Sequence, residues 1–436
     1  MFPSRRFLWV ASAGLLPCLL APIWDGGYPV ALAWLVFCGC AAASERILGL
    51  RPEEVGVRRT LPRVFSLGET ADVVLTLRND TPRPAQVEVM DSPPGDWETE
   101  GLPLQARLAP RGDAELRYRV RPERRGQMEF REVTLRVTQG AGLLVHQISV
   151  PATERVRVYP DLRHVARYEL LARRAHLGEM GIHRMRTSGQ GSEFERLRDY
   201  TPDDEYRRID WKATARRGRP ISRVFEMERS QHVLIVVDAG RRMAARSGRH
   251  TRLDQAVNAA LLLCHVVLKA GDRVGLLVVS DRVEAFLPPG KGQRHFHQCL
   301  ELLYGVEARY CHVEYGAAME QIVTRCRRRA LVVVFSELVD EDASAELVQA
   351  VRLLRPLHLP LCVTMENEGI TACADQAVTS VDSLFERAAA LELLAERRTV
   401  VERLQRDGAL VLESPPEQLS VQVVNRYLEL KARQLL

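Results

Sequence analysis

The chain has 436 residues, which is long enough for two or three domains of ordinary size. Lys and Arg number 61 and Asp and Glu 56, so the net charge of +5 is too small for this length to indicate a nucleic-acid partner. Nine cysteines without C-x-x-C spacing argue against a disulfide framework and a structural zinc site, and favour a reduced, cytoplasmic environment.

Two uncharged apolar runs open the chain, at residues 7–23 and 28–43. Each is near the lower limit of the roughly 17–25 residues that cross a bilayer as a helix. The pair predicts a transmembrane helical hairpin over residues 1–46. Arg5 and Arg6 before an apolar run are also typical of a signal peptide. The hairpin is favoured because no small-x-small cleavage site separates the two runs.

Arginines flank the two runs, and the loop between them has none. Because Lys and Arg accumulate on the cytoplasmic side of membrane spans, this pattern predicts two spans in a bacterial inner membrane. Both chain ends and all soluble domains would then face the cytoplasm. A single span would instead put the large domains outside, as in a cell-surface adhesin.

Apolar and polar residues alternate at 73–78, 116–121 and 133–137, and clusters of Pro, Gly, Asn and Asp lie between such stretches. This pattern predicts a small antiparallel β-sandwich, immunoglobulin-like in size, over residues 53–150. Its outward arginines are interpreted as a solvated surface, with a docking patch for anionic lipid as the alternative.

Residues 155–230 mix acidic and basic side chains densely, and aromatic residues punctuate them. We therefore expect an ordered segment in which carboxylates and guanidinium groups pair. A metal or acid–base site at Asp203-Asp204-Glu205 is the alternative. Acids interleave with the arginines, which disfavours a nucleic-acid surface.

In the last part of the chain, residues 231–436, apolar runs alternate with helical patterns. The runs are predicted to be buried strands at 232–237, 272–280, 331–335, 359–364 and 409–412. Strands buried on both faces and alternating with helices predict an α/β fold with a doubly wound parallel sheet. Such sheets bind ligands at the carboxyl ends of their strands, where the first strand places Asp238.

The stretch from Gly191 to Met243, GSEFERLRDYTPDDEYRRIDWKATARRGRPISRVFEMERSQHVLIVVDAGRRM, resembles the signature of domain of unknown function 58. The resemblance implies membrane spans, a β region and a C-terminal von Willebrand factor A-like domain. It also implies work as an adaptor or assembly factor with a MoxR-type AAA+ ATPase. The signature residues singled out are Glu193, Arg196, Asp199, Tyr200, Asp204, Arg208, Asp210, Trp211, Lys212 and Arg216.

Von Willebrand A-like domains often bind Mg²⁺ through Asp-x-Ser-x-Ser, a loop Thr and a later Asp, because Mg²⁺ prefers hard oxygen ligands. Here Asp238 is kept, but Gly240 and Arg242 replace the serines. Ser336-Glu337 stands where Ser-Asp is usual, and the loop around 314–316 has no Thr. We therefore expect no working metal or other cofactor. Asp238 and Glu337 are expected to pair with Arg241 or Arg242, or with a partner's arginine at a degenerate edge that serves as an interface.

Motifs for catalysis are missing from the sequence. There is no G-x-x-x-x-G-K-[ST] loop and no H-E-x-x-H, and the segment Pro288-Pro289-Gly290-Lys291-Gly292 is interpreted as a turn after a strand. The sequence therefore predicts a membrane-anchored protein-binding scaffold, not an enzyme, with no nucleic-acid or small-molecule ligand. A surface adhesin and an unrecognised membrane-associated hydrolase remain the alternatives.

Overall fold

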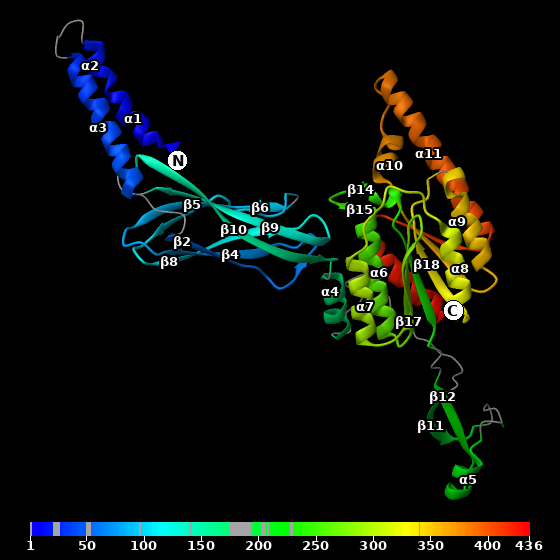
Figure 1. Ribbon diagram of the computed structural model, residues 1–436. Helices are drawn as coiled ribbons and strands as arrows, with labels where there is room; N and C mark the ends of the chain where they lie inside the picture. Colours follow the sequence, from blue (N-terminus) through cyan, green and yellow to red (C-terminus); the bar gives the residue numbers. More distant parts are fainter. Residues whose placement is uncertain are drawn as a thin grey trace. The chain divides into compact units, whose positions relative to one another are not determined.

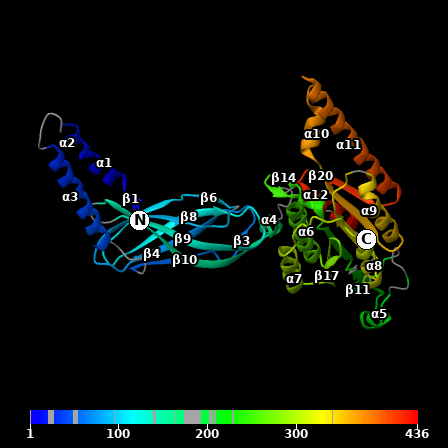
Figure 2. The ribbon, with the colours of Figure 1, turned by 45° about the horizontal axis from the view of Figure 1, so that its top comes forward.

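The computed structural model describes residues 2–20, 27–48, 54–95, 97–138, 142–161, 163–173, 193–201, 206, 209–226, 230–339 and 341–436. The chain divides into two compact units, Met1–Asp161 and Leu162–Leu436 (Figures 1 and 2). Each unit has its own hydrophobic core, and each is described by itself.

Three helices and a two-residue strand begin the first unit: β1 (Phe2–Pro3), α1 (Arg5–Ala13), α2 (Leu15–Leu20) and α3 (Gly27–Leu48). Only α3, among the described residues, is long and apolar enough to cross a membrane, with a mean hydropathy of 1.5 over Gly27–Ser44. The predicted hairpin of two spans is wrong, because Gly14 ends α1 and the first apolar run forms two short helices instead of one span.

The short helices pack along α3. Trp34 Nε1 donates a hydrogen bond to the carbonyl oxygen of Val10 at 3.0 Å. A Cβ atom at Gly14 would lie 2.5 Å from the Trp34 ring, so glycine permits this close approach.

Two sheets form the rest of the first unit, and their strands pair antiparallel except for β3 with β10, which pair in parallel. One sheet has the order β2-β4-β8-β6; the other has the order β1-β10-β9-β5-β7, with β3 pairing β10. The strands are β2 (Val55–Thr60), β3 (Phe65–Ser66), β4 (Ala71–Asn79), β5 (Ala85–Asp91), β6 (Glu98–Glu100), β7 (Leu104–Leu108), β8 (Asp113–Arg121), β9 (Gly126–Thr138) and β10 (Leu144–Tyr159). Alternate residues of both sheets share one core, as in a β-sandwich, and β10 extends past the predicted end at residue 150.

A charged cluster lies inside this sandwich. Arg59 and Asp91 form an ion pair with fully buried side chains, and Arg59 Nε donates to Asp91 Oδ2 at 2.9 Å. The Tyr118 hydroxyl also donates to Asp91 Oδ2, at 2.5 Å, and burial raises the pKa of this phenol. The ion pair is satisfied by hydrogen bonds, as burial of charge requires.

The second unit begins with α4 (Arg163–Arg173), then β11 (Glu193–Asp199), α5 (Trp211–Arg217) and β12 (Ile221–Glu226), in which β11 and β12 pair antiparallel. A six-stranded sheet follows, with the order β17-β16-β13-β18-β19-β20. Its strands are β13 (His232–Asp238), β16 (Arg273–Val279), β17 (Val283–Gly290), β18 (Ala330–Phe335), β19 (Leu359–Met365) and β20 (Leu410–Ser414). The two-residue strands β14 (Arg246–Ser247) and β15 (His250–Thr251) form a small hairpin.

Helices cover both faces of this sheet: α6 (Arg252–Lys269), α7 (Gln293–Tyr304) and α12 (Leu419–Ala432) on one, and α8 (Tyr315–Arg325), α9 (Glu341–Leu354) and part of α11 (Val381–Arg406) on the other (Figure 1). The short elements are η4 (Arg241–Ala244) and α10 (Glu368–Asp375). Along β13, Val233, Ile235 and Val237 pack into one core, and Leu234 and Val236 into the other. The continuous apolar run of this strand follows from burial on both faces.

The predicted fold class requires correction, because the sheet is mixed and not wholly parallel. Strands β13, β16, β18, β19 and β20 pair in parallel, whereas β17 pairs antiparallel with β16. Only residues 280–282 connect β16 to β17, and a parallel partner would need a crossover of about a dozen residues or more. The expected turn at residues 288–290 is the end of β17, an edge strand, where proline is tolerated.

Candidate functional site

Polar side chains collect where two neighbouring strands of the mixed sheet end. Asp238 is the last residue of β13, and Ser336 and Glu337 follow directly after β18. The register pairs Val237 with Phe335, so Asp238 and Ser336 emerge side by side. This edge carries the carboxyl ends of the parallel strands, where open α/β sheets place their sites.

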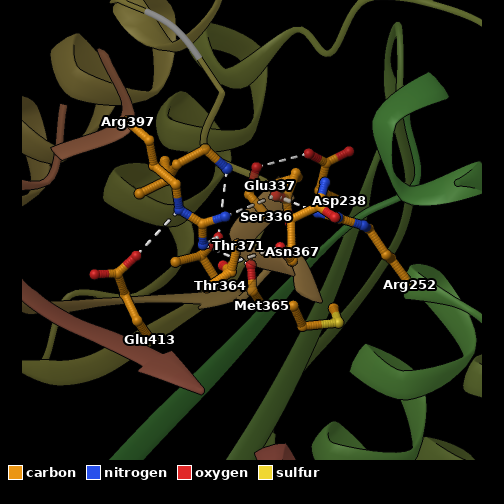
Figure 3. A network of polar contacts seen from close by, with 11 residues as sticks. Asp238, Arg252, Ser336, Glu337, Thr364, Met365, Asn367, Thr371, Arg397 and Glu413 are labelled. Carbon is orange, nitrogen blue, oxygen red and sulfur yellow. Dashed lines mark hydrogen bonds and ion pairs between the residues drawn. The ribbon is translucent and has the colours of Figure 1, made fainter. Parts of the chain in front are cut away.

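Three oxygen atoms form a closed triangle at this edge. The Tyr315 hydroxyl donates to Asp238 Oδ2 at 2.7 Å, and Ser336 Oγ donates to the same oxygen at 2.8 Å. The two hydroxyl oxygens are themselves 2.6 Å apart. The other carboxylate oxygen, Oδ1, accepts a hydrogen bond from the backbone N–H of Gly240 at 2.7 Å. Figure 3 shows Asp238 and Ser336 within the larger polar network.

When Asp238 is ionised, the triangle has three oxygen–oxygen contacts but only two hydroxyl protons. Two hydroxyl groups supply two protons for three contacts, and the third proton is present only when the carboxyl group is protonated. Burial raises the pKa of Asp238, although hydrogen bonds from Tyr315, Gly240 and Ser336 oppose the rise. Burial also raises the pKa of the Tyr315 phenol well above its ordinary range. Both shifts favour the protonated form of these two groups.

A second network surrounds Glu337, which is 5% exposed. Its carboxylate pairs with Arg252, at the start of α6, and with Arg397, on α11, where Nη1 lies 3.4 Å from Oε1. Oε2 of Glu337 and Nε of Arg252 make no hydrogen bond within the described residues. Burial raises the pKa of Glu337, while the charges of both guanidinium groups lower it.

Arg397 connects Glu337 to the next two strands. Its Nη2 donates to Thr364 Oγ1 at 3.2 Å and to the Met365 carbonyl at 2.5 Å, both on β19. Its Nε donates to Glu413 Oε1, on β20, at 3.1 Å (Figure 3). One buried guanidinium group thus holds α11 against three strand ends.

A pocket of about 150 Å³ lies over Asp238. Its lining residues are Asp238, Arg241, Arg242, Cys311, His312, Val313, Tyr315, Asp342 and Glu346. Pockets for small molecules usually measure about 300–1,000 Å³, so this one is the size of a few water molecules or one side chain. Its lining carries both signs of charge.

The donor set at this edge does not fit a Mg²⁺ ion. Among the described residues, no three His, Cys, Asp or Glu side chains come together as metal ligands do. Asp238 offers one carboxylate whose oxygens accept three hydrogen bonds, and the positive charge of Arg242 acts on the same carboxylate. Mg²⁺ requires near-octahedral oxygen coordination.

Only some of the site residues predicted from the sequence lie together in the structure. Asp238, Gly240 and Ser336 form one cluster, Arg242 lines the pocket above it, and Glu337 belongs to the neighbouring network. Gly240 is required there, because a Cβ atom would lie 2.3 Å from Val313 Cγ2.

The hydrogen-bond and ion-pair partners of the two acids differ from the expected ones, and the charge of Arg242 acts on both carboxyl groups. Asp238 bonds to hydroxyl groups, and the ion pairs of Glu337 are made with Arg252 and Arg397 and not with Arg241 or Arg242. The expectation of a threonine in this loop missed Tyr315, whose hydroxyl contacts Asp238 and Ser336. Nothing in the sequence distinguishes Arg252 and Arg397 from the many other arginines.

The signature segment forms a local structure of its own. Asp210 caps α5, its Oδ1 accepting from Ala213 N at 3.0 Å, and Asp199 pairs with Arg219 at 2.9 Å. Trp211 is 58% exposed and its ring lies 5.6 Å from that of Tyr206. The backbone N–H of Tyr200 donates a hydrogen bond to the Pro220 carbonyl, and Lys212 and Arg216 are exposed on α5. Asp204 and Arg208, with the side chains of Glu193 and Arg196, lie outside the described residues.

Curated relatives match part of the chain. The chain is 25% identical over 245 residues to Uncharacterized protein YeaD of Bacillus subtilis, covering 54% of this chain and 58% of that one. It is 28% identical over 153 residues to Uncharacterized protein Rv1480 of Mycobacterium tuberculosis, covering 35% and 48%. The chain thus spans about half the length of the curated relatives it matches.

The similar solved structures are β-sandwich domains. The PapD-like domain 7 of human CEP192 covers 25% of this chain and 89% of its own, at 13% identity and a TM-score of 0.19. A FixG-related protein from Vibrio parahaemolyticus covers 24% and 96%, at 10% identity and a TM-score of 0.18. The fold class is corrected on the strand pairing of the chain itself, to a mixed α/β sheet plus a β-sandwich.

One family model matches the chain over residues 196–368, which include most of the signature segment and β13, β16, β18 and β19 of the mixed sheet. Asp238, Tyr315, Ser336 and Glu337 all lie inside the match. These residues are identified as a domain of the family described as "Protein of unknown function DUF58".

Proposed function

We propose that the chain is a membrane-anchored scaffold that binds a protein partner at the carboxyl edge of its mixed sheet. The partner that the family resemblance suggests is a MoxR-type AAA+ ATPase, and the work would be assembly or maturation of protein complexes. The observation that carries this proposal is the small pocket of mixed charge above the Asp238 triangle.

The size and charge of the pocket favour a side chain of a partner over a free ligand. About 150 Å³ is below the usual range for small molecules. Arg241, Asp342 and Glu346 line it and are exposed, so a partner's charged groups find complementary ones there. Charge complementarity of this kind sets specificity and association rate.

Below the pocket, the buried networks give the edge a fixed shape. Asp238 and Glu337 are 2% and 5% exposed, and their contacts join β13 and the end of β18 to α6, α8 and α11. Arg397 extends this network to β19 and β20. A surface that is ordered before binding loses less conformational entropy when a partner docks.

A catalytic role is not part of the proposal. Ser336 is 4% exposed, and its hydroxyl is bonded to Asp238 and Tyr315. A nucleophilic serine needs a base that takes its proton and an open approach for the substrate. The contacts of Ser336 suit a structural hydroxyl group better.

Anchoring by α3 and a cytoplasmic position of both units are also part of the proposal. Arg46, Arg51 and Arg58 follow the apolar stretch of α3 within about fifteen residues, whereas no Lys or Arg occurs in the twenty residues before Gly27. Arg5 and Arg6 lie in α1, more than twenty residues before the span, so the arginines after the span set its orientation and leave its carboxyl-terminal side in the cytoplasm, in contrast to the single span considered from the sequence. A reporter fused after Leu436 tests the side, and a reporter active only outside the cytoplasm would point to the adhesin alternative.

Affinity purification of the tagged full chain from detergent-solubilised membranes tests the partner. The test variants are Arg241→Glu and Arg242→Glu, which reverse the charge at the pocket. The matched control is Arg329→Glu, an exposed residue directly before β18 at the opposite edge of the sheet.

We expect an AAA+ ATPase to copurify with the wild type and with Arg329→Glu, and to be lost with both pocket variants. Equal recovery with all variants would reject the sheet edge as the interface. Failure to recover any ATPase, with or without nucleotide, would reject the ATPase partner.

A further inference from the structure

Helix α11 extends beyond the sheet that its second half covers (Figures 1 and 2). Near its carboxyl end, Val400, Val401 and Leu404 are buried in the core. Its amino-terminal half, residues 381–395, is mostly exposed, although α10 packs against it. Ser380 starts the helix with a capping box to Ser383, so the exposed half begins at a defined cap.

The exposed half carries a coiled-coil pattern. Apolar residues recur at alternating intervals of three and four, the spacing of a and d positions in a heptad repeat. These residues are Val381, Leu384, Ala388, Leu391 and Ala395, here called the α11 seam, and all five are exposed. Val381, Leu384 and Leu391 are 68%, 52% and 50% exposed.

The fold covers the side of the helix that lies next to the seam on one flank. Arg387 and Leu394 are partly buried there, and Ala390 is 5% exposed. Helix α10 therefore leaves the seam open. A helical stripe of this regularity, exposed to water over two heptads, fits a second helix.

The charged residues beside the seam indicate which helix packs against it. In the heptad set by the seam, Arg387 takes a g position and Glu392 the e position five residues later. In a parallel pair of identical helices, g of one chain lies beside that e of the other, so each interface would hold two opposite-charge pairs. In an antiparallel pair, Arg387 would meet Arg387 of the other chain. Alanine at two seam positions also lets two backbones approach closely.

We propose that two copies of this chain associate in parallel through the α11 seam, forming a short two-stranded coiled coil. The seam covers two heptads, so the contact is weak by itself. Two chains held in one membrane meet at a raised effective concentration, so a larger fraction of them associates without any additional interaction at the contact. The pocket at the sheet edge is not part of this association, so either proposal can fail alone.

Sedimentation of the full chain in detergent, over a concentration series, measures the association. Leu384→Glu and Leu391→Glu each place a charge in the seam and are expected to leave monomers. Leu393→Glu is the matched control, because Leu393 is 39% exposed but lies off the seam. A wild type that remains monomeric at every concentration, or an equal loss in the control, would overturn the proposal.

Charge reversal tests the parallel arrangement. Arg387→Glu alone and Glu392→Arg alone each place like charges together and are expected to raise the dimer Kd about tenfold. The double variant restores opposite charges and should recover wild-type association, and a mixture of the two single variants should form heterodimers. Failure of the double variant to recover would contradict a parallel pair.

Cross-linking in intact membranes provides a readout without detergent. In a parallel pair, residue 391 faces residue 391 of the other chain, so Leu391→Cys should give a disulfide-linked dimer on mild oxidation. Leu393→Cys and the wild type, which carries its own cysteines, are the controls. Equal cross-linking of all three would refute the seam.

Discussion

Replacing Arg397 with methionine should destabilise the second unit much more than the same change at its neighbour Arg398. The Arg397 side chain is 11% exposed and contacts Glu337, Glu413, Thr364 and the Met365 carbonyl. The Arg398 side chain is 82% exposed and contacts Glu402, one turn along the helix. Methionine retains much of the length and apolar stem of arginine, so the comparison isolates the guanidinium group.

The expected loss of unfolding free energy depends on the groups that lose their partner in each variant. Removing one partner of a buried ion pair costs about 3–5 kcal/mol, because the other charge stays buried. Glu337 keeps Arg252 and Glu413 is 39% exposed, so the lower end, about 3 kcal/mol, is expected for Arg397→Met. An exposed pair four residues apart on a helix contributes at most about 0.5 kcal/mol, which bounds the cost of Arg398→Met.

Differential scanning calorimetry of the full chain measures the effect. For a unit of this size, about 3 kcal/mol lowers Tm by about 6 °C, whereas Arg398→Met should shift it by about 1 °C or less. The transition that moves should be the one of the second unit, with the transition of the sandwich unchanged. Equal shifts for the two variants would refute the assignment of Arg397 as the residue that holds α11 to the strand ends.

Four further results are expected. Arg59→Met, which leaves Asp91 buried without its cation, should cost the sandwich about 3–5 kcal/mol in chemical denaturation, whereas Arg58→Met at an exposed neighbour should cost under about 0.5 kcal/mol. Tyr315→Phe should cost about 1 kcal/mol, since it removes one hydrogen bond to Asp238; no change would mean that the triangle does not form. Because the pKa of Asp238 is raised in the folded state, its protonation stabilises the fold fully below the unfolded pKa of about 3.9, and this stabilisation is lost as pH rises through the folded pKa. Asp238→Asn removes the titrating group, so the free energy of unfolding should fall less with rising pH than in the wild type. Leu35→Arg, near the middle of α3, should reduce recovery of the chain in washed membranes, and undiminished recovery would contradict anchoring by α3.

Four strands of the mixed sheet, β13, β16, β18 and β19, were visible in the sequence because each is buried on both faces. The continuous run His232–Val237 is an example, with every residue from Val233 to Val237 fully buried in β13. Strand β17 was not visible, because it is an edge strand of intermediate burial that ends in prolines. Its position decides that the sheet is mixed.

The first apolar run shows a different limit. Composition alone does not distinguish one long helix from two short ones, and the close packing of Gly14 against Trp34 is a contact between distant residues. Only the structure shows that α3 alone, among the described helices, is both long and apolar enough for a span.

Part of the candidate site followed from strand periodicity. Strand ends place Asp238 and Ser336 at one edge, and the register brings them together. Arg252 and Arg397 approach Glu337 from residues far away in the sequence, and charge pairing among 61 basic residues has no local pattern. Tyr315 could be predicted from the sequence only if any residue with a hydroxyl group, and not threonine alone, were accepted in its loop.

Photo-cross-linking from the pocket tests the central claim most directly. A photoreactive amino acid at the exposed pocket residue His312, in the full chain within cells, should form an adduct with an AAA+ ATPase. The same amino acid at Arg329, at the opposite edge of the sheet, should not. Equal adducts from both positions, or none from His312 in cells that contain the ATPase, would contradict a partner interface at this edge.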